Sequence, residues 1–328
     1  MSFRRWSWFG TLLIVGCVLA GLIVHLLQAD VWAALSFVPP VLWWLVAAVA
    51  AGPMWLRGQS WQRRTLAAGL LIYALFAVEE VSSLGRWAWH GFRLEDSGPR
   101  VRIVSLNCNV GSSVAAREVQ ALNPDVVLLQ ESPGEAAVWE VATELFGEEA
   151  AVVYGRDCSI VARGRLEAVD DFPNATGTAA IWTMPDGRPL RVVSLRLAPP
   201  VIRIDYWSPD CWREYAAVRR KHREQLRAIV KATSASGSEA ATVIGGDFNL
   251  PARDGALDVM PDDMIDAFRT AGRGWGNTAL NQFPVARPDQ VWCSRQLAVT
   301  TCFARKTEHS DHRLVVCDLA IAVESDER

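Results

Sequence analysis

Four residues with oxygen-bearing side chains follow hydrophobic stretches that are predicted to be β-strands. Asn107 closes the stretch VRIVSLN, and Glu131 follows DVVLLQ. Asp247 and Asn249 end TVIGGDFN, where alternate residues of an extended chain point to one face. Carboxylate and amide oxygens suit Mg²⁺, which usually keeps several waters and takes substrate phosphate as well. The four residues therefore predict a divalent-metal site for phosphate chemistry at the open ends of buried strands.

A second group of residues places an imidazole beside two acids. His312 and Asp311 belong to SDH, just before the strand-like LVVCDL, and Asp289 lies upstream in RPDQVW. An acid that is hydrogen-bonded to an imidazole fixes its tautomer and raises its basicity. Asp289 or Asp311 could do this for His312, with the other carboxylate facing the metal.

Each of these residues taken alone also has a plainer interpretation. An Asp or Asn near glycine is commonly a turn residue, a Glu after a strand is a solvated end, and an Asp–His pair is a cap or surface pair. Gly245 and Gly246 indicate a place where another backbone or a ligand approaches closely. The order of the motifs and their shared position at strand ends favour one joint site.

The motifs SLNCN, LLQES, GGDFNLP, RPDQVW and SDHRLVV, in this order, resemble those of the endonuclease/exonuclease/phosphatase superfamily over residues 100–322. GDFN and SDH at this separation are the most specific part. The resemblance implies an α/β fold, a four-layer α/β sandwich in which two packed mixed sheets are flanked by helices. It also implies hydrolysis of phosphoester bonds with Mg²⁺ or Mn²⁺. Three apolar segments ahead of such a domain resemble a membrane-anchored bacterial branch of the superfamily.

The resemblance implies a role for each residue of the metal and water side of the site. Asn107 and Glu131 would hold the metal ion, and Asp311 would sit beside it. Asp247 would activate or orient the water that attacks phosphorus in line.

The same resemblance implies how the phosphate is held. Asn249 would bind the scissile phosphate, and Asp289 would orient His312, which would stabilise or protonate the phosphoryl oxygens. Many members carry a histidine in a THL-like strand end, but VVSLRLAPP has Arg196 there. Arginine clamps phosphate with two hydrogen bonds and does not donate a proton usefully near neutral pH. Arg196 therefore predicts phosphate binding and also leaves open a catalytically degenerate, membrane-bound binding module of the same fold.

Downstream of residue 100 the chain alternates strand-like and helix-like stretches. Many short strands, the turn-forming PDG and a few helices favour an α/β sandwich with mixed sheets. The seven cysteines show no zinc-binding spacing, and most are expected to be free buried thiols, although their pairing cannot be read from the sequence.

The N-terminal third is far more apolar than the remainder. Residues 9–28, 31–51 and 65–81 are candidate membrane spans, the third being the shortest in its uncharged part. About 20 apolar residues cross a hydrocarbon core as a helix, so we expect three transmembrane helices and a lipid bilayer around residues 9–81. Pro39 and Pro40 either kink the second span or mark its start.

Basic residues near the spans predict their orientation. Arg4 and Arg5 precede the first span, and Arg57, Arg63 and Arg64 lie between the second and the third, whereas the first connection carries no cation. Because cytoplasmic loops collect Lys and Arg, the N-terminus is predicted to be cytoplasmic and the catalytic domain extracytoplasmic, in a multi-pass membrane protein.

Four parts follow from this pattern: a membrane anchor over 1–85, a linker over 86–99, the catalytic domain over 100–322 and a tail over 323–328. Two alternatives remain for the anchor. The first span could be a cleaved signal peptide, since IVGC resembles a lipoprotein cleavage site at Cys17, or the whole segment could be a buried helical domain. The apolar run beyond Cys17 and the basic flanks favour membrane spans.

The composition leaves the substrate open. A net charge of −3 creates no global basic field to attract nucleic acid, although a local patch can suffice. Nucleic acid, a lipid head group and a small phosphoester all remain candidate substrates of a metal-dependent phosphodiesterase, nuclease or phosphatase. No motif indicates a protein partner.

Overall fold

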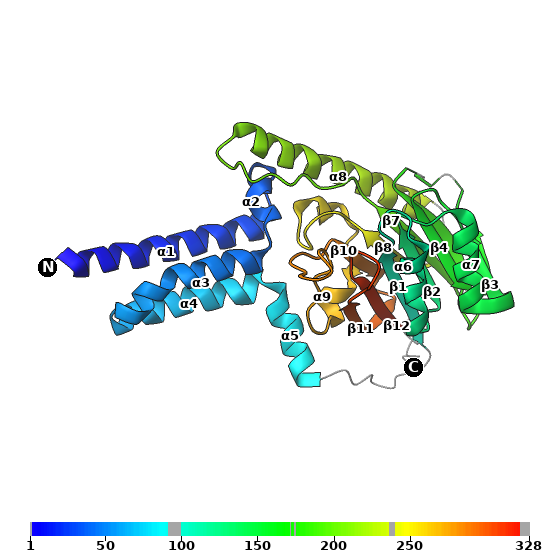
Figure 1. The fold of residues 1–328 in the computed structure, drawn as a ribbon, viewed down its shortest axis with the longest axis horizontal. Coiled ribbons are helices and arrows are strands. Elements are labelled where there is room, and N and C mark those ends of the chain that lie inside the picture. Colours follow the sequence, from blue (N-terminus) through cyan, green and yellow to red (C-terminus); the bar gives the residue numbers. More distant parts are fainter. Residues whose placement is uncertain (1, 91–99, 171, 174, 236–239, 322–328) are drawn as a thin grey trace, which may run out of the picture.

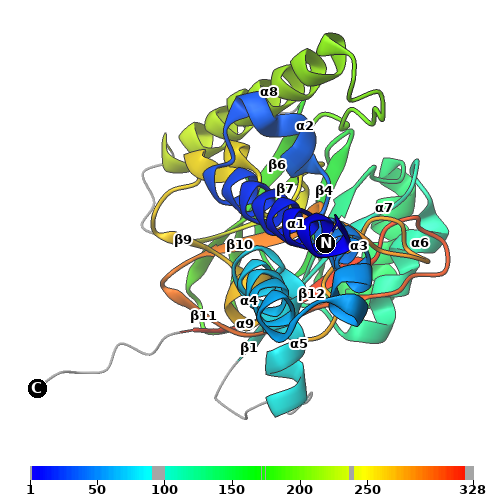
Figure 2. The same cartoon turned by 90° about the vertical axis from the view of Figure 1, so that its left-hand side faces the viewer.

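The computed structural model describes residues 2–90, 100–170, 172–173, 175–235 and 240–321, which form a helical bundle and an α/β sandwich (Figure 1). Figure 2 looks along the bundle toward the sandwich. The helices of the bundle are α1 (Ser2–Leu27), η1 (Asp30–Trp32), α2 (Ala33–Phe37), α3 (Pro40–Arg57), α4 (Ser60–Ala77) and α5 (Glu79–His90).

Two helices are long and apolar enough to cross a membrane, where three were predicted. They are Trp8–Leu27 within α1 and Pro40–Arg57, which is α3. The predicted third span corresponds to α4 and α5, which meet the same criterion only as a pair and are bent by 82° against each other. The bend follows because α4 ends at Ala77 and the acidic first turn of α5 begins at Glu79.

The two prolines mark the start of α3. Pro40 is its first residue, a position whose N–H has no acceptor within the helix, so proline loses no hydrogen bond there. Pro39 is the residue before it. The second candidate span therefore begins later than predicted, because residues 31–37 belong to η1 and α2. At the other end of the bundle, α5 reaches His90, inside the predicted linker. The linker residues 91–99 and the tail 323–328 lie outside the described residues.

Two six-stranded mixed sheets pack face to face, as predicted. The first has the order β11-β12-β1-β2-β4-β3 and the second β5-β6-β7-β8-β10-β9. The strands are β1 (Arg100–Asn107), β2 (Val126–Gln130), β3 (Ala150–Val153), β4 (Cys158–Arg163), β5 (Leu166–Ala168), β6 (Gly177–Thr183), β7 (Pro189–Arg196), β8 (Ala241–Asp247), β9 (Met264–Asp266), β10 (Asp289–Ser294), β11 (Leu297–Arg305) and β12 (Leu314–Ile321).

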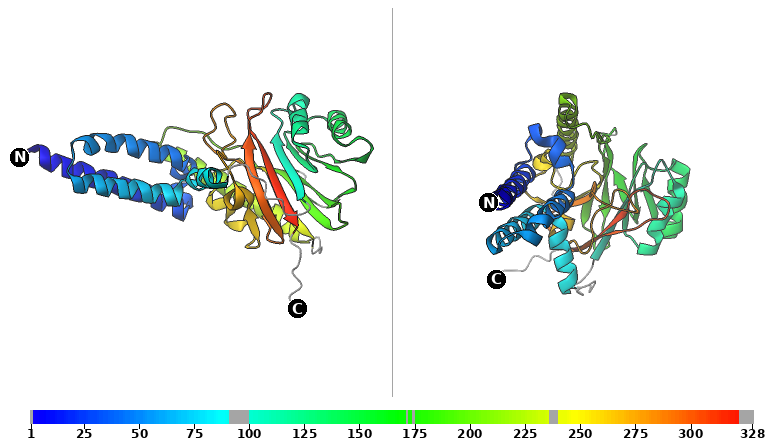
Figure 3. Two further views of the ribbon diagram at one scale, coloured as in Figure 1. Left: turned by 90° about the horizontal axis from the view of Figure 1, so that it is seen from below. Right: turned by 60° about the vertical axis from the view of Figure 1, so that its left-hand side comes forward.

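Helices cover the outer face of each sheet (Figure 3). Val127 and Leu129 of β2 face α7, whereas the neighbouring Leu128 faces the second sheet, so both faces of this strand are buried. Apolar side chains of α8 and η4 cover the second sheet on its outer side. All seven cysteines are free, six of them buried. The remaining helices of the sandwich are α6 (Ser113–Arg117), η2 (Glu118–Leu122), α7 (Glu135–Phe146), η3 (Gly147–Glu149), α8 (Pro209–Ala235), η4 (Gly255–Val259) and α9 (Ala267–Ala271).

Strand pairing brings the polar strand ends to one edge of the sandwich. β1 and β2 are parallel, and so are β7 and β8, which puts Asn107 beside Gln130 and Arg196 beside Asp247. β10 runs antiparallel to β8 and starts at the same edge, with Asp289 opposite Asp247. The topology therefore gathers residues that are far apart in the sequence before any side-chain contact is considered.

Gly246, next to Asp247, shows why this edge requires glycine. Its φ is +145°, and a Cβ there would lie 1.9 Å from the carbonyl oxygen of Leu195 on the neighbouring strand. A Cβ on Gly245 would lie 2.7 Å from Leu128 of the facing sheet. A neighbouring backbone makes the close approach at Gly246, which is one of the two predicted alternatives, whereas a core side chain makes it at Gly245.

We expect Gly246→Ala to lower the free energy of unfolding by at least about 2 kcal/mol, because backbone must move to admit the methyl group. Thermal unfolding of the detergent-purified chain, followed by circular dichroism, measures this loss. Gly85→Ala is the matched control, since nothing lies within 4 Å of a Cβ at this helical position. Equal midpoints for the two variants would contradict the packing described for Gly246.

Candidate active site

Asn107 links the two sheets at the polar edge. Its buried side-chain amide donates to Oε1 of Glu131 at 3.2 Å and to Oδ2 of Asp247 at 3.1 Å. Glu131 follows the first sheet's β2, and Asp247 ends the second sheet's β8. The carboxyl groups of two separate sheets therefore share one amide donor.

Glu131 is held as a charged carboxylate. Its backbone adopts a positive φ of 44°, and its Oε2 accepts the N–H of Val110 at 2.6 Å. Arg196 donates to Oε1 at 2.8 Å. Burial alone would raise the pKa of Glu131, but the hydrogen bonds from Val110 and Asn107 and the charge of Arg196 lower it below its usual value.

Asp247 lies in a different electrostatic environment. The residue is buried, and its Oδ1 accepts the N–H of Asn249 at 3.0 Å. Burial, together with the negative charge of Asp289, raises the pKa of Asp247 to about 7. Two nearby carboxyl groups with separated pKa values are typical of sites that hold one charge and move one proton.

Asn249 is positioned by its own unusual backbone. Its φ is +52°, and its side-chain nitrogen donates to the carbonyl oxygen of Leu197 at 3.0 Å. An amide nitrogen carries two hydrogens, so one N–H has no acceptor among the described residues.

His312 pairs with Asp289, one of the two acids considered for it. Nδ1 of His312 donates to Oδ2 of Asp289 at 2.8 Å, and Thr278 donates its hydroxyl to the same oxygen. Burial alone would lower the pKa of His312, but the charge and hydrogen bond of Asp289 raise it to about 10. His312 is therefore protonated at neutral pH, with Nε2–H on the far side of the ring from Asp289.

One cluster of the described residues has the spacing of a metal site. One ligand atom each from Asp247, Asp289 and His312 lies within 4.8 Å of the others. Oδ1 of Asp289 is buried without a hydrogen-bond partner, which a cation would satisfy. Glu131 and the amide of Asn107 adjoin this cluster through Asp247. The carboxylate and amide oxygens of this group fit a divalent cation, and the protonated His312 would lie beside it as a hydrogen-bond donor.

Two predicted site residues are placed differently from their expected roles. The carboxylate of Asp311 is exposed and forms no hydrogen bond or ion pair with any residue that the structure describes. Arg196, predicted to clamp phosphate, is ion-paired with Glu131 at 2.8 Å and with Asp157 at 3.4 Å. The other predicted residues, Asn107, Glu131, Asp247, Asn249, Asp289 and His312, come together at the edge.

Three supporting residues were not predicted from the sequence. Ser310 donates to the carbonyl oxygen of Asn107 at 2.7 Å and accepts the N–H of His312 at 3.0 Å, which ties SDH to the end of β1. Its place in SDH was a usable signal. Thr278 and Asp157 lie in loops, and no sequence pattern marks them.

Several solved structures share this fold at low sequence identity. An endonuclease/exonuclease/phosphatase from Bacteroides vulgatus has a TM-score of 0.54 and 16% identity, over 69% of this chain and 100% of that chain. A mannosyl-6-phosphatase from Bacteroides thetaiotaomicron has a TM-score of 0.52 and 14% identity, over 67% and 100%. Truncated TDP2 from Caenorhabditis elegans has a TM-score of 0.51 and 16% identity, over 70% and 100%.

These likenesses establish the fold, and no curated protein matches the chain in sequence. The model of the Endonuclease/Exonuclease/phosphatase family matches residues 104–312, more than half of the chain. The matched range contains every residue of the edge described above, from Asn107 to His312. With two packed sheets and their polar strand ends in place, the chain belongs to the endonuclease/exonuclease/phosphatase family, whose members hydrolyse phosphoester bonds.

Proposed function

We propose that the chain is a membrane-anchored, divalent-metal-dependent phosphoester hydrolase that directs in-line attack of water on phosphorus. The observation that carries the proposal is the convergence on one edge of Asn107, Glu131 and Asp247 with the Asp289–His312 pair. Buried carboxyl groups and a charged imidazole are costly to hold together unless a ligand uses them.

Each residue has a distinct task in this mechanism. Asp247, with a pKa of about 7, exchanges protons at neutral pH and orients and deprotonates the water. Asn249 donates its free amide hydrogen to the phosphate. Protonated His312 donates from Nε2 to a phosphoryl oxygen as negative charge develops there.

The metal of the proposal is Mg²⁺ or Mn²⁺. Asn107 and Glu131 would hold it, and the unsatisfied Oδ1 of Asp289 offers a further oxygen. Asp311 reaches this group only if its exposed side chain turns inward. The ion would supply positive charge that polarises the phosphate and lowers the barrier to attack.

We expect Asp247→Ala and His312→Ala each to lower hydrolysis of bis-p-nitrophenyl phosphate about 100-fold or more, because each removes a group that acts on the reacting atoms. The assay uses the purified full chain with Mg²⁺ or Mn²⁺. Asp186→Asn, in the exposed turn between β6 and β7, is the control and keeps wild-type activity. Unchanged rates in both site variants would reject the site assignment.

A second candidate function is a degenerate, membrane-bound binding module. It is favoured by the ion pair between Arg196 and Glu131, which places a fixed cation where the proposed ligand carboxylate would meet a metal. In that case Arg196 satisfies Glu131 permanently, and no metal binds there.

Calorimetric titration with Mg²⁺ or Mn²⁺ separates the two functions. For the hydrolase we expect saturable binding that Glu131→Gln weakens at least about tenfold, since one charged ligand is lost. Glu167→Gln, an exposed position on β5, leaves binding unchanged. Absence of any binding heat in the wild-type chain favours the binding module.

The bundle supports the membrane part of the proposal. α1 and α3 are apolar enough to span, and α4 runs back beside them, with Trp44 of α3 donating to the carbonyl oxygen of Leu70 of α4. Three passes place the N-terminus and the sandwich at opposite ends of the bundle (Figure 1). Arg57 and Arg63 flank the turn at the N-terminal end. We therefore propose α4 as a third span, a cytoplasmic N-terminus and an extracytoplasmic catalytic domain.

Alkaline phosphatase fused after residue 328 should be active, because this enzyme matures outside the cytoplasm. The same fusion after Gly58, in the turn between α3 and α4, should be inactive. A reporter protein that fluoresces only in the cytoplasm is fused to the C-terminus as a second test. Fluorescence of this fusion would contradict the topology and would leave α1 and α3 as the two spans.

Three substrate classes fit the site as described so far. Nucleic acid, a lipid head group and a small phosphoester each present a tetrahedral phosphate to such a metal site. The mannosyl-6-phosphatase with this fold supports a sugar phosphate as one example of the last class.

A further inference from the structure

The most exposed large apolar side chains of the sandwich lie on three loops beside the active site. Among the described residues from 100 to 321, no large apolar side chain outside these loops is more than 50% exposed. Scattered exposed apolar residues are common on soluble proteins, but such a concentration indicates a binding surface. The side chains, between 64% and 88% exposed, are Val110, Ile202, Ile204, Trp207, Leu280 and Phe283. We call these six residues the apolar rim.

The backbones of the rim loops are bonded to the site itself. The N–H of Val110 binds Glu131, and Leu197, at the start of the second loop, accepts the amide of Asn249. In the third loop, Ala279 forms a backbone bridge with His312, one residue before Leu280. Each of the three loops is therefore bonded through its backbone to a residue of the site, and Val110 and Leu280 lie at or next to these bonds.

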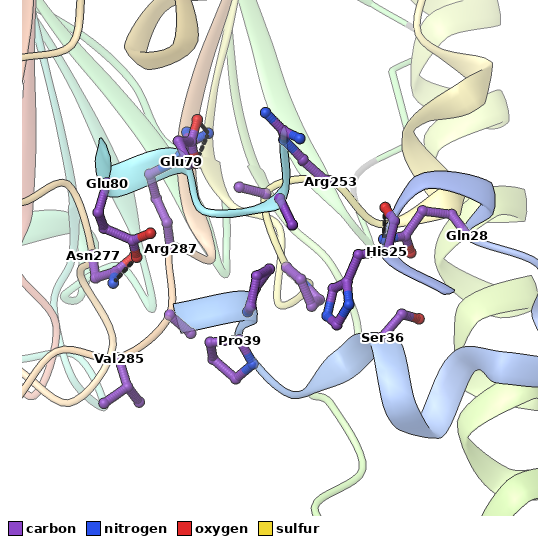
Figure 4. Close-up of a pocket in the computed structure, with 15 residues that line it drawn as sticks. His25, Gln28, Ser36, Pro39, Glu79, Glu80, Arg253, Asn277, Val285 and Arg287 are labelled. Carbon is purple, nitrogen blue, oxygen red and sulfur yellow. Dashed lines mark hydrogen bonds and ion pairs between the residues drawn. The ribbon is translucent and has the colours of Figure 1, made fainter. Parts of the chain in front are cut away.

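The third loop is also bonded to the bundle. Asn277 donates to Oε1 of Glu80 at 2.7 Å, and Arg287 forms an ion pair with Glu79 at 2.9 Å. Both acids belong to the first turn of α5. Figure 4 shows these two pairs and places Val285 of the same loop across a pocket from Pro39. One loop thus connects the ends of the apolar helices to His312.

The second loop reaches the bundle by apolar contacts. Val201 and Tyr206 pack with Ala33 and Ala34 of α2. The ring of Trp32, at the end of η1, lies 6.1 Å from that of Trp212 at the start of α8. Tryptophan gathers at the boundary between membrane and water, so the exposed Trp207 between these contacts is placed at that boundary if the bundle spans a bilayer.

The charges of the same loops do not favour a polyanion. Arg196 is neutralised by Glu131 and Asp157, and Arg203 forms ion pairs with Asp205 and Glu214. Nucleic acid binding relies on cations that are free to replace the counterions of successive phosphates. The rim offers apolar contact instead.

We infer that the substrate is a phosphoester of a membrane lipid, an inference that rests on the proposed hydrolase function. The head group enters the site while Leu280, Phe283 and Trp207 contact the apolar part of the lipid at the membrane surface. Burying apolar surface in this way favours lipid over soluble phosphoesters. The anchor keeps the site at the surface where its substrate is concentrated.

The reaction itself is an ordinary hydrolysis. The water oxygen forms a bond to phosphorus, and the bond from phosphorus to one ester oxygen breaks. The water proton passes to the carboxylate of Asp247, which returns it to solvent, and the departing oxygen takes up a proton from solvent. No oxidant, reductant or second substrate is needed.

The test compares lipid and soluble substrates in the reconstituted full chain. Vesicles of phosphatidylcholine carry phosphatidylglycerol, sphingomyelin or a phosphatidylinositol monophosphate, and mass spectrometry follows the products. We expect the ratio of lipid hydrolysis to bis-p-nitrophenyl phosphate hydrolysis to fall at least about tenfold in the double variant Leu280→Ser/Phe283→Ser, since two apolar contacts are lost. Trp139→Ser, an exposed apolar position on α7, is the control and leaves the ratio unchanged.

An unchanged ratio in the double variant overturns the inference, and so does a wild-type chain that hydrolyses the soluble diester but none of the lipids. A wild-type chain that hydrolyses neither substrate overturns the proposed function as well. A second readout does not depend on activity: phosphatidylcholine with a diazirine in its acyl chain should label residues 280–283. Photolabelling confined to residues 2–90 counts against the rim.

Discussion

The arrangement of the site depends on the two hydrogen bonds of the Asn107 amide. One amide reaches a carboxylate of each sheet, Glu131 at 3.2 Å and Asp247 at 3.1 Å, so a shift of either sheet would break one of them. Such a contact is available only because parallel strand pairs bring their carboxyl ends to the same edge. The rest of the site is attached to this point, since the hydroxyl of Ser310 donates to the carbonyl oxygen of Asn107 and accepts the backbone N–H of His312. A packed sandwich thereby fixes distances that loops alone would leave variable.

Charge balance explains why these carboxyl groups tolerate burial together. Glu131 is balanced by Arg196, and Asp289 by the protonated His312. Asp247 forms no ion pair with the residues that the structure describes, and its pKa rises to about 7 because its burial and Asp289 both disfavour a further negative charge. A divalent cation would add the missing charge and favour the ionised form of Asp247, since an opposite charge lowers a carboxyl pKa. It would also share Glu131 with Arg196, so the guanidinium is then freer to turn toward a phosphate oxygen. The ion pair and the predicted phosphate contact are in this way compatible.

Sequence patterns predicted the residues at strand ends well and the residues in loops poorly. Asp247, Asn249 and His312 follow or precede strong hydrophobic runs, so their position on an edge could be deduced from periodicity. Thr278, which shares Oδ2 of Asp289 with His312, comes from a loop whose path depends on its contacts with α5 and therefore leaves no local signal. Asp311 shows the converse limit, because it is adjacent to His312 in sequence but is exposed, and Asp289 pairs with His312 instead. In the bundle, hydropathy identified α1 and α3. The bend before Glu79 depends on how the helices pack, which a count of apolar residues does not capture.

The contacts between bundle and sandwich make the bundle part of the site's architecture. Arg287, which lies two residues before Asp289 in sequence, is buried between Glu79 of α5 and Asp266 of β9. Asn277, which bonds Glu80, directly precedes Thr278. A displacement of α5 would therefore act through a short, ion-paired segment on the carboxylate that orients His312. Arg219 makes an equivalent connection from α8, where it bonds the carbonyl oxygen of Gln28 at the end of α1 and the carboxylate of Asp254. A flexible tether would need none of these buried ion pairs, which are costly to form unless geometry is well defined. The structure thus favours an enzyme that works with its site at a fixed position relative to its helical bundle.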